Sequence, residues 1–171
     1  LVAIAEIGDK TQLLALMLAA RFRKPVPIIL GILAATILNH ALAAGVGAAA
    51  AAFLAGSWMK WVLGAAFLVF AAWALIPDKM DDDEAPAAKA GASVFWTTAV
   101  AFFFVEMGDK TQVATIALGA RFHDVALVAT GSTRGMMIAN APVVLICAAA
   151  AGKLPLKYIR WAAAACFAAI G

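Results

Sequence analysis

The sequence predicts an all-α integral membrane protein in which six transmembrane helices form two inverted three-helix repeats. Three observations predict this fold class: an apolar composition, six long apolar segments, and two copies of one polar motif. Of the 171 residues, 65% are hydrophobic and only 13% are charged, whereas soluble domains carry about 25% charged residues. Too few polar side chains are present to cover a water-facing surface, so lipid is the expected solvent.

The apolar segments predict the helices in chain order. A helix needs about 20 mostly apolar residues to cross a bilayer. The expected spans are residues 1–20, 28–54, 58–76, 93–120, 125–151 and 156–171. Between the third and fourth spans, residues 77–92 contain two prolines and the acidic run Asp81–Glu84, which predicts a solvated linker.

An internal repeat at an offset of 100 residues divides the chain into two halves. The segment Glu6–Gln12 matches Glu106–Gln112 at six of its positions, and Ala20–Phe22 matches Ala120–Phe122. The first span has fewer residues ahead of its motif than the fourth, so about one to two helical turns are expected to be missing at the N-terminus. The predicted units are a first repeat, a cytoplasmic linker and a second repeat, at residues 1–76, 77–92 and 93–171.

The number of helices and the basic residues predict the orientation. Because three helices is an odd number, the second repeat enters the membrane from the opposite side, which makes the repeats inverted. Lys and Arg concentrate in loops on one expected side, for example Arg21, Arg23 and Lys24, and such loops are usually cytoplasmic. We therefore expect a multi-pass protein of the bacterial inner (plasma) membrane, with its N-terminus outside. Nucleic-acid binding is not expected, because the basic residues lie in short loops rather than on a polar domain.

The two motifs place ionisable groups inside apolar spans, where such groups are costly and usually mark a functional pathway. The candidate metal ligands are Glu6, Asp9, Glu106 and Asp109. On continuous helices, both acids and the lysine of each motif would share one face, which must point into the bundle. Together the motifs hold four carboxylates and two lysines, a net charge that balances one divalent cation. A helix break at the glycine of each motif would free backbone carbonyls as ligands, and close helix packing there is the alternative.

The ligand set also limits the cation. It offers only oxygen atoms, which suit Mg²⁺, Ca²⁺ and Mn²⁺ better than copper or zinc, and we expect Mn²⁺ or Ca²⁺ as transported substrate, with no cofactor. Glu6 and Glu106 are also the candidates for proton exchange, because a carboxylate must lose its proton to bind metal. Additional candidate cation ligands are Thr11, Gln12, Thr111, Gln112, Asn39 and Asn140.

Several of these polar residues allow a second interpretation. Asn39 and Asn140 could equally form hydrogen bonds between helices. His40 occurs in one half only and is either a proton-accepting group or a packed core side chain. Arg134 either pairs with a motif carboxylate or extends toward a membrane interface.

Two copies of the pattern E-x-G-D-K-T resemble the motif of uncharacterised protein family 0016, in the LysE-like transporter superfamily. That family includes the MneA-type bacterial manganese exporters and the Golgi calcium/manganese–proton exchangers. The resemblance covers essentially the whole chain. It implies cation/proton antiport and a fold related to the LysE-type exporters, and its motif acids map onto Glu6, Asp9, Glu106 and Asp109.

These observations predict a secondary transporter, not an enzyme, that exports a divalent cation from the cytoplasm in exchange for protons. An exporter of a small organic cation or amino acid is the first alternative, and it would need a more aromatic and apolar pocket. A membrane-embedded metal-dependent enzyme is the second, and it would need an activated water and an acid–base group. The third is a selective channel, against which saturable, proton-coupled flux would argue.

Overall fold

The computed structural model describes residues 2–6, 9–53, 56, 58–74 and 93–147, and within this part of the chain all regular structure is helical. The helices are α1 (Val2–Ala5), α2 (Lys10–Phe22), α3 (Pro25–Phe53), α4 (Met59–Ala74), α5 (Val94–Glu106), α6 (Lys110–Phe122) and α7 (Val125–Cys147). The predicted linker and the predicted sixth span lie outside the described residues.

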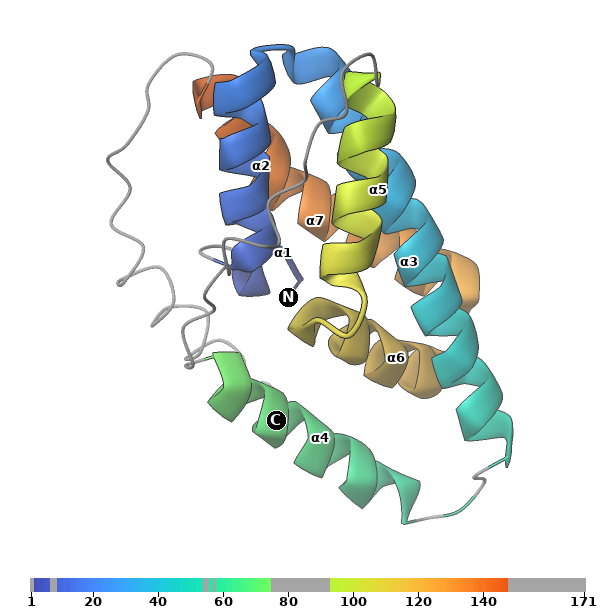
Figure 1. Ribbon diagram of the computed structural model, residues 1–171. Coiled ribbons are helices and arrows are strands. Elements are labelled where there is room, and N and C mark those ends of the chain that lie inside the picture. Colours follow the sequence, from blue (N-terminus) through green and yellow to red (C-terminus); the bar gives the residue numbers. More distant parts are fainter. Residues whose placement is uncertain (1, 7–8, 54–55, 57, 75–92, 148–171) are drawn as a thin grey trace.

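The long helix α3 runs along one side of the bundle over most of its length (Figure 1). Among the described helices, its segment Pro25–Ala52 is the one that is long and apolar enough to cross a membrane, whereas Val94–Glu106 is apolar but shorter. At about 1.5 Å per residue, 28 residues extend over roughly 42 Å, more than the hydrocarbon thickness of about 30 Å. Helix α3 packs against α5, α6 and α7, while α4 packs against α6.

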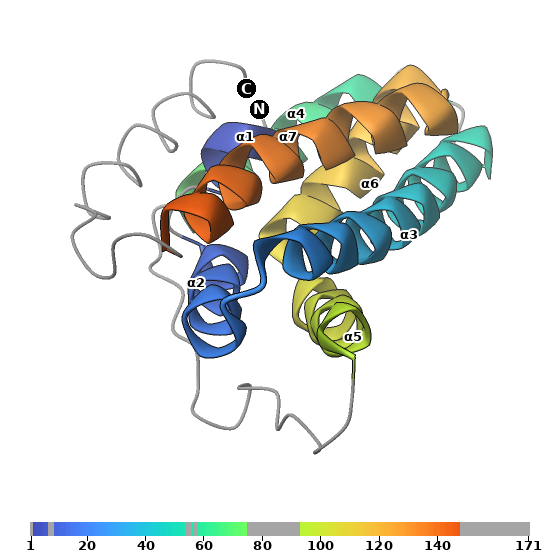
Figure 2. The same ribbon diagram turned by 90° about the horizontal axis from the view of Figure 1, so that it is seen from above.

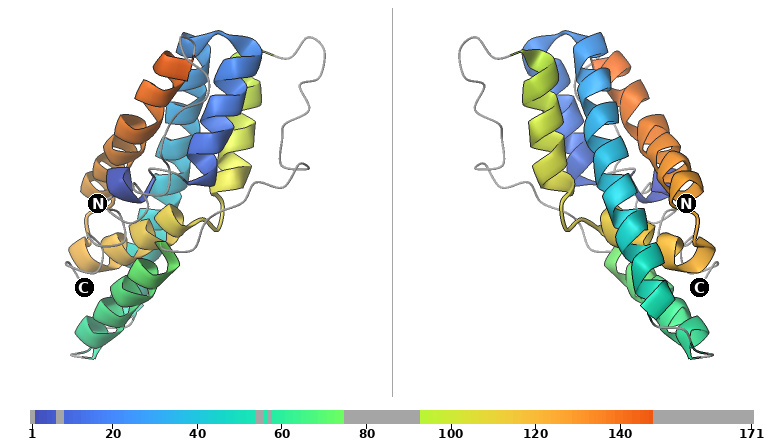
Figure 3. Two further views of the ribbon diagram at one scale, coloured as in Figure 1. Left: turned by 90° about the vertical axis from the view of Figure 1, so that its left-hand side faces the viewer. Right: turned by 90° about the vertical axis from the view of Figure 1, so that its right-hand side faces the viewer.

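Helices α5 and α6 cover different halves of α3 (Figure 3). Near the start of α3, Gly31 lies against α5, and a Cβ atom there would be 2.8 Å from the carbonyl oxygen of Phe95. Near its end, Gly47 lies against the backbone of α6 at Ile116 and Ala120. Seen from above, α3 and α7 flank α6 (Figure 2). Helix α7 runs antiparallel to α3 and also packs against α1 and α2.

The spans expected at residues 1–20 and 93–120 are not continuous helices, because each is interrupted at its motif. Of the two interpretations given to the motif glycines, the second motif shows the helix break. In the second span the interruption includes Gly108, whose φ of +79° is readily accessible only to glycine. After each interruption a helix of 13 residues follows. Both helices end at a left-handed residue, Arg23 (φ 52°) or His123 (φ 56°), whose N–H donates to a carbonyl four residues earlier at 3.0 Å. The two halves therefore share one local conformation around their motifs.

Apolar side chains form both the core and much of the outer surface. The core joins α2, α3, α5 and α7, and includes Leu14, Leu18, Ile28, Ile32, Phe102 and Met136. On the outside of α3, large apolar side chains are at least half exposed, namely Ile37, Leu38, Leu42 and Val46. Soluble monomers rarely expose a contiguous apolar surface of this kind, so the outer face of the bundle suits lipid.

The contact of α3 with α6 predicts a contrast between two neighbouring glycines. Gly47→Ala would place a methyl group against the backbone of Ile116, and such overpacking typically costs about 1–3 kcal/mol. Gly45→Ala meets no atom within 4 Å and gains about 1 kcal/mol of helix propensity. We expect Gly47→Ala to lower the thermal unfolding midpoint of the purified protein in detergent, and Gly45→Ala to keep or raise it. Equal midpoints for the two variants would contradict this packing.

Candidate metal centre

Carboxylates from the two motifs meet in the interior of the bundle. Glu6, Asp9 and Asp109 each offer one carboxylate oxygen, and these atoms lie within 4.8 Å of one another. All three side chains are buried. Two acids come from the first motif and one from the second, so we call these three residues the acid cluster. Of the four acids predicted from the sequence, Glu106 is also fully buried but is not part of this cluster.

The helix interruptions give both aspartates the same backbone geometry. Asp9 is the N-cap of α2 with φ −81° and ψ 167°, and Asp109 is the N-cap of α6 with φ −77° and ψ 163°. Each aspartate N–H donates to the carbonyl oxygen of the glutamate three residues before it, at 3.2 Å from Asp9 and 3.1 Å from Asp109. The N-terminus of a helix favours negative charge because its N–H groups and dipole point toward it. The sequence therefore places both aspartates where a buried carboxylate is best tolerated.

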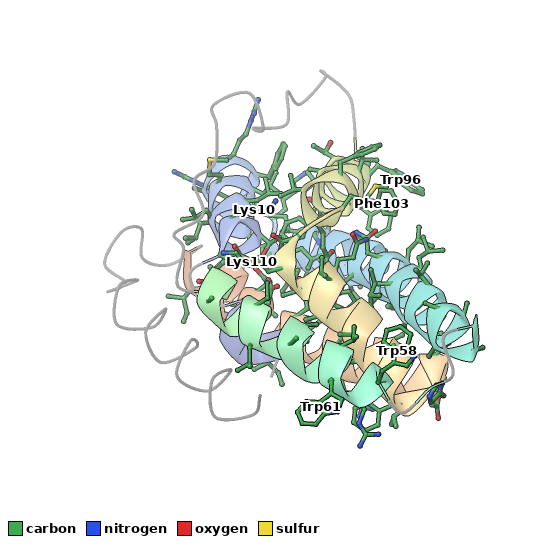
Figure 4. The ribbon with its side chains drawn as sticks, turned by 90° about the horizontal axis from the view of Figure 1, so that it is seen from below. Lys10, Trp58, Trp61, Trp96, Phe103 and Lys110 are labelled. Carbon is green, nitrogen blue, oxygen red and sulfur yellow. The ribbon has the colours of Figure 1, made fainter. Side chains whose placement is uncertain are left out.

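The expectation that the acids and lysine of each motif share one face of a continuous helix holds only in part: the acids are buried in the bundle, and Glu6 and Asp9 lie together. In the second motif α5 ends at Glu106 and α6 begins at Lys110, so no continuous helix carries these side chains. Lys10 Nζ instead lies 3.5 Å from Asp109 Oδ1, so the lysine of the first motif pairs with an acid of the second. Figure 4 shows Lys10 and Lys110 where α2 and α6 begin. The interruptions thus join the two motifs electrostatically.

The two glutamates have different surroundings. Thr11 Oγ1 donates a hydrogen bond of 2.6 Å to Glu6 Oε2, and Glu6 Oε1 has no hydrogen-bond partner among the described residues. Glu106 lies against the middle of α3, where Asn39 Nδ2 donates to its Oε2 at 3.4 Å. His40 Nε2 lies 2.9 Å from Glu106 Oε1, although the two groups are not aligned as a hydrogen bond. His40 is therefore a buried neighbour of the candidate site.

Of the other predicted ligands, the two threonines contact carboxylates of the acid cluster, whereas the two glutamines bond to backbone groups. Thr11 contacts Glu6, and Thr111 Oγ1 lies 3.4 Å from Asp109 Oδ2. Gln12 Nε2 donates to the carbonyl of Ala139 in α7 at 3.2 Å, which ties α2 to α7.

Gln112 Oε1 accepts the N–H of Gly108 at 2.6 Å and so stabilises the turn between α5 and α6. Asn140 Nδ2 donates to Met136 at 3.2 Å, while its Oδ1 has no partner among the described residues. Arg134 is exposed and pairs with no carboxylate of the described residues. Pairing of Arg134 with a motif acid was therefore wrong.

The sequence interpretation missed one residue beside the site, Thr36. Thr36, Asn39 and His40 are all buried on one face of α3, at the spacing of three and four residues that brings side chains together. Three polar residues at this spacing in an otherwise apolar helix are the signal that could have identified it.

The apolar outer surface, together with buried acids contributed by two copies of one motif, is typical of the class of membrane cation transporters. The chain matches the family model described as "Divalent cation/proton antiporter GDT1" over residues 1–82 and 94–171, and it belongs to this family. This confirms the relationship expected from the motif.

A curated relative supports the same class. The chain is 51% identical over 167 residues to a protein of Vibrio cholerae serotype O1 named "Putative manganese exporter", and the match covers 97% of this chain and 82% of that protein. No solved structure matches the chain. Family and relative are both transporters, so the chain is a membrane transport protein.

The turn that positions Asp109 gives a testable prediction. Gly108→Ala would force a Cβ-bearing residue into φ +79°, which costs about 1–2 kcal/mol. We expect a lower thermal unfolding midpoint in detergent. Gly131→Ala is the control, because Gly131 lies inside α7 with no atom near its Cβ position, and it should keep the midpoint or raise it. An unchanged midpoint for Gly108→Ala would contradict the described turn.

Proposed function

We propose that this chain exports Mn²⁺ from the cytoplasm in exchange for protons, with Ca²⁺ as the alternative substrate. The observation that carries this proposal is the acid cluster, in which both motifs contribute buried carboxylates whose oxygens lie within 4.8 Å of one another. The printed name of the Vibrio cholerae relative supports manganese over calcium.

Charge and ligand chemistry support a divalent cation as the occupant. Buried carboxylates are unfavourable unless opposite charge compensates them. The motifs contain four carboxylates and two lysines, so one divalent cation neutralises the remaining charge. The cluster offers oxygen atoms without sulfur or imidazole nitrogen, the preference of hard cations such as Mn²⁺ and Ca²⁺.

Neutral oxygen ligands would complete the coordination. Asn39 and Asn140 each have a buried Oδ1 atom without a partner among the described residues. Ca²⁺ takes six to eight oxygen ligands, commonly including amide carbonyls. We assign these two amide oxygens as supplementary ligands, with Thr11 and Thr111 orienting the acids. The contacts of Gln12 and Gln112 support a structural role for those two side chains.

Proton coupling follows if the metal and protons use the same oxygen atoms. A carboxylate must be deprotonated to bind metal, so protonation of Glu6 would release the cation and metal binding would displace the proton. Glu106 is the second candidate for proton exchange, and its contacts with Asn39 and His40 on α3 keep it outside the cluster in this conformation. Exchange would then need no separate proton pathway.

We further propose six transmembrane helices in two inverted repeats, residues 1–76 and 93–171, with a cytoplasmic linker at 77–92. The shared backbone conformation at Asp9 and Asp109 supports the repeat, and α2 and α6 lead away from the motifs in different directions (Figure 1). Exposed tryptophans, which favour membrane interfaces, include Trp96 in α5 and Trp61 in α4 (Figure 4). Both lie near the starts of their helices, and these starts are at opposite ends of the bundle (Figure 1). The bacterial inner membrane and an external N-terminus are the location and orientation proposed.

A single shared site predicts equal roles for the two aspartates. Asp9→Asn and Asp109→Asn should each weaken Mn²⁺ binding to the purified protein. Loss of a residue that only supports a metal ligand typically costs about 10- to 100-fold in metal affinity, so loss of a ligand should cost at least as much. Isothermal titration in detergent measures this. Asp124→Asn is the control, because Asp124 is exposed and caps α7 through Leu127 N at 2.9 Å. Full Mn²⁺ affinity in either cluster variant would exclude a shared site.

Competition between protons and metal predicts pH-dependent affinity. As the pH falls, the carboxylates of the metal-free protein gain protons that Mn²⁺ must displace, so the apparent Kd should rise, by up to about tenfold per pH unit for each proton. Titrations between about pH 5.5 and 8.5 test this. Glu6→Gln should flatten the dependence because Gln cannot titrate, and Asp124→Asn should leave it intact. A flat profile in the unmodified protein would mean that coupled protons use other groups.

A further inference from the structure

Two buried hydroxyl groups in the bundle, those of Thr36 and Thr133, have no hydrogen-bond partner among the described residues. Serine and threonine side chains inside helices commonly donate to a carbonyl one turn earlier. Thr98, Thr115, Thr130 and Ser132 do so, at 2.7 to 2.8 Å. Thr36 and Thr133 are 0% and 6% exposed, yet neither hydroxyl has a hydrogen-bond partner among the described residues.

An unpartnered buried hydroxyl requires a physical explanation. Its burial costs free energy comparable to a lost hydrogen bond, and water or an ion that the hydroxyl contacts is the usual reason that such a group persists. In α7, Ser132 is the immediate neighbour of Thr133 and donates to Val128 O at 2.8 Å, so a hydrogen bond back to the helix is available at this part of α7. Thr36 and Thr133 therefore direct their oxygens elsewhere.

The positions of these two threonines relate them to the metal site. Thr36 lies three and four residues before Asn39 and His40, the α3 residues that contact Glu106. Thr133 lies seven residues before Asn140 in α7. At about 1.5 Å per residue, these offsets are roughly 4.5 Å along α3 and 10.5 Å along α7. Because α3 and α7 run antiparallel (Figures 1 and 3), the two hydroxyls are displaced toward opposite ends of the bundle.

We propose that Thr36 and Thr133 line the cation pathway on opposite sides of the acid cluster, where each hydroxyl oxygen replaces a water ligand of the passing divalent cation. A hydroxyl is a neutral oxygen ligand with two acceptor sites. Transport requires binding that admits the ion without retaining it, which suits neutral ligands on either side of a charged site. This inference rests on the proposed function, because it takes the acid cluster as the central site.

The test uses the full-length protein in proteoliposomes of uniform, verified orientation. Mn²⁺/H⁺ exchange is measured with Mn²⁺ varied on each side in turn, for Thr36→Val and Thr133→Val. Valine keeps the shape of threonine and removes only the hydroxyl. The matched controls are Thr98→Val and Ser132→Ala, whose hydroxyls bond back to their own helices. Equilibrium Mn²⁺ binding and the thermal midpoint are measured for each variant, together with Asp9→Asn.

We expect Thr36→Val to raise KM on one side of the membrane and Thr133→Val on the other, each about three- to tenfold, as for loss of one polar interaction. Mn²⁺ binding should change less than KM. The thermal midpoint should stay or rise, because an unpaired hydroxyl has been replaced by a methyl group. Both control variants should keep their KM on both sides.

The possible failures can be told apart. If Thr36→Val and Thr133→Val keep KM on both sides while Asp9→Asn loses Mn²⁺ binding, the pathway proposal is overturned and the proposed function stands. Equal KM changes in the control variants would also overturn it, since they would show a general effect of altering buried hydroxyls. If Asp9→Asn itself binds and exchanges Mn²⁺ normally, the proposed function fails.

Discussion

Carboxylates buried in an apolar bundle need compensation, and the structure around the motifs provides it in three ways. The interruptions place Asp9 and Asp109 at helix N-termini, where peptide dipoles offset negative charge. Lys10 reaches across to Asp109, so charge is balanced between the two motifs. On α3, Asn39 and His40 contact Glu106. The first two of these features depend on the interruption, because a continuous helix would have no N-terminus at Asp9 or Asp109.

The two motifs resemble each other more in backbone conformation than in the side chains that surround them. Asp9 and Asp109 have nearly the same φ and ψ, yet Glu6 is hydrogen bonded to Thr11 whereas Glu106 contacts side chains of α3. Asn140, the counterpart of Asn39 in α7, donates to Met136 instead, and His40 has no counterpart in α7.

Sequence patterns predicted the helices well where the pattern depends on local composition. The spans expected at 28–54, 58–76 and 125–151 correspond to α3, α4 and α7 within the described residues. Mapping of the family motif identified the acids, three of which the structure brings together. The sixth span, at 156–171, lies outside the described residues and stays a prediction.

Local sequence patterns did not predict the directions in which the motif side chains point. Helical periodicity assigns side chains to faces only while the helix continues, and the positive φ of Gly108 redirects everything after it. The pairing of Lys10 with Asp109 joins residues 99 positions apart, so no local spacing indicates it. The role of His40 was ambiguous for the same reason, because its neighbour Glu106 lies on another helix and local spacing does not predict that contact.

The close contacts of α3 have a mechanical consequence. At Gly31 and Gly47 the backbone of α3 closely approaches α5 and α6, because a Cβ atom at either glycine would lie within 3.0 Å of backbone atoms of Phe95 or Ile116. Helix α3 therefore packs against both parts of the interrupted second span, α5 and α6. These contacts restrain the turn at Gly108 that joins the two parts. In the first half the pieces α1 and α2 rest chiefly on α7 instead. Because Gly135 brings α7 similarly close to the backbone of α1 at Ala3, we expect each interrupted span to move together with the long helix it packs against, α7 in the first half and α3 in the second.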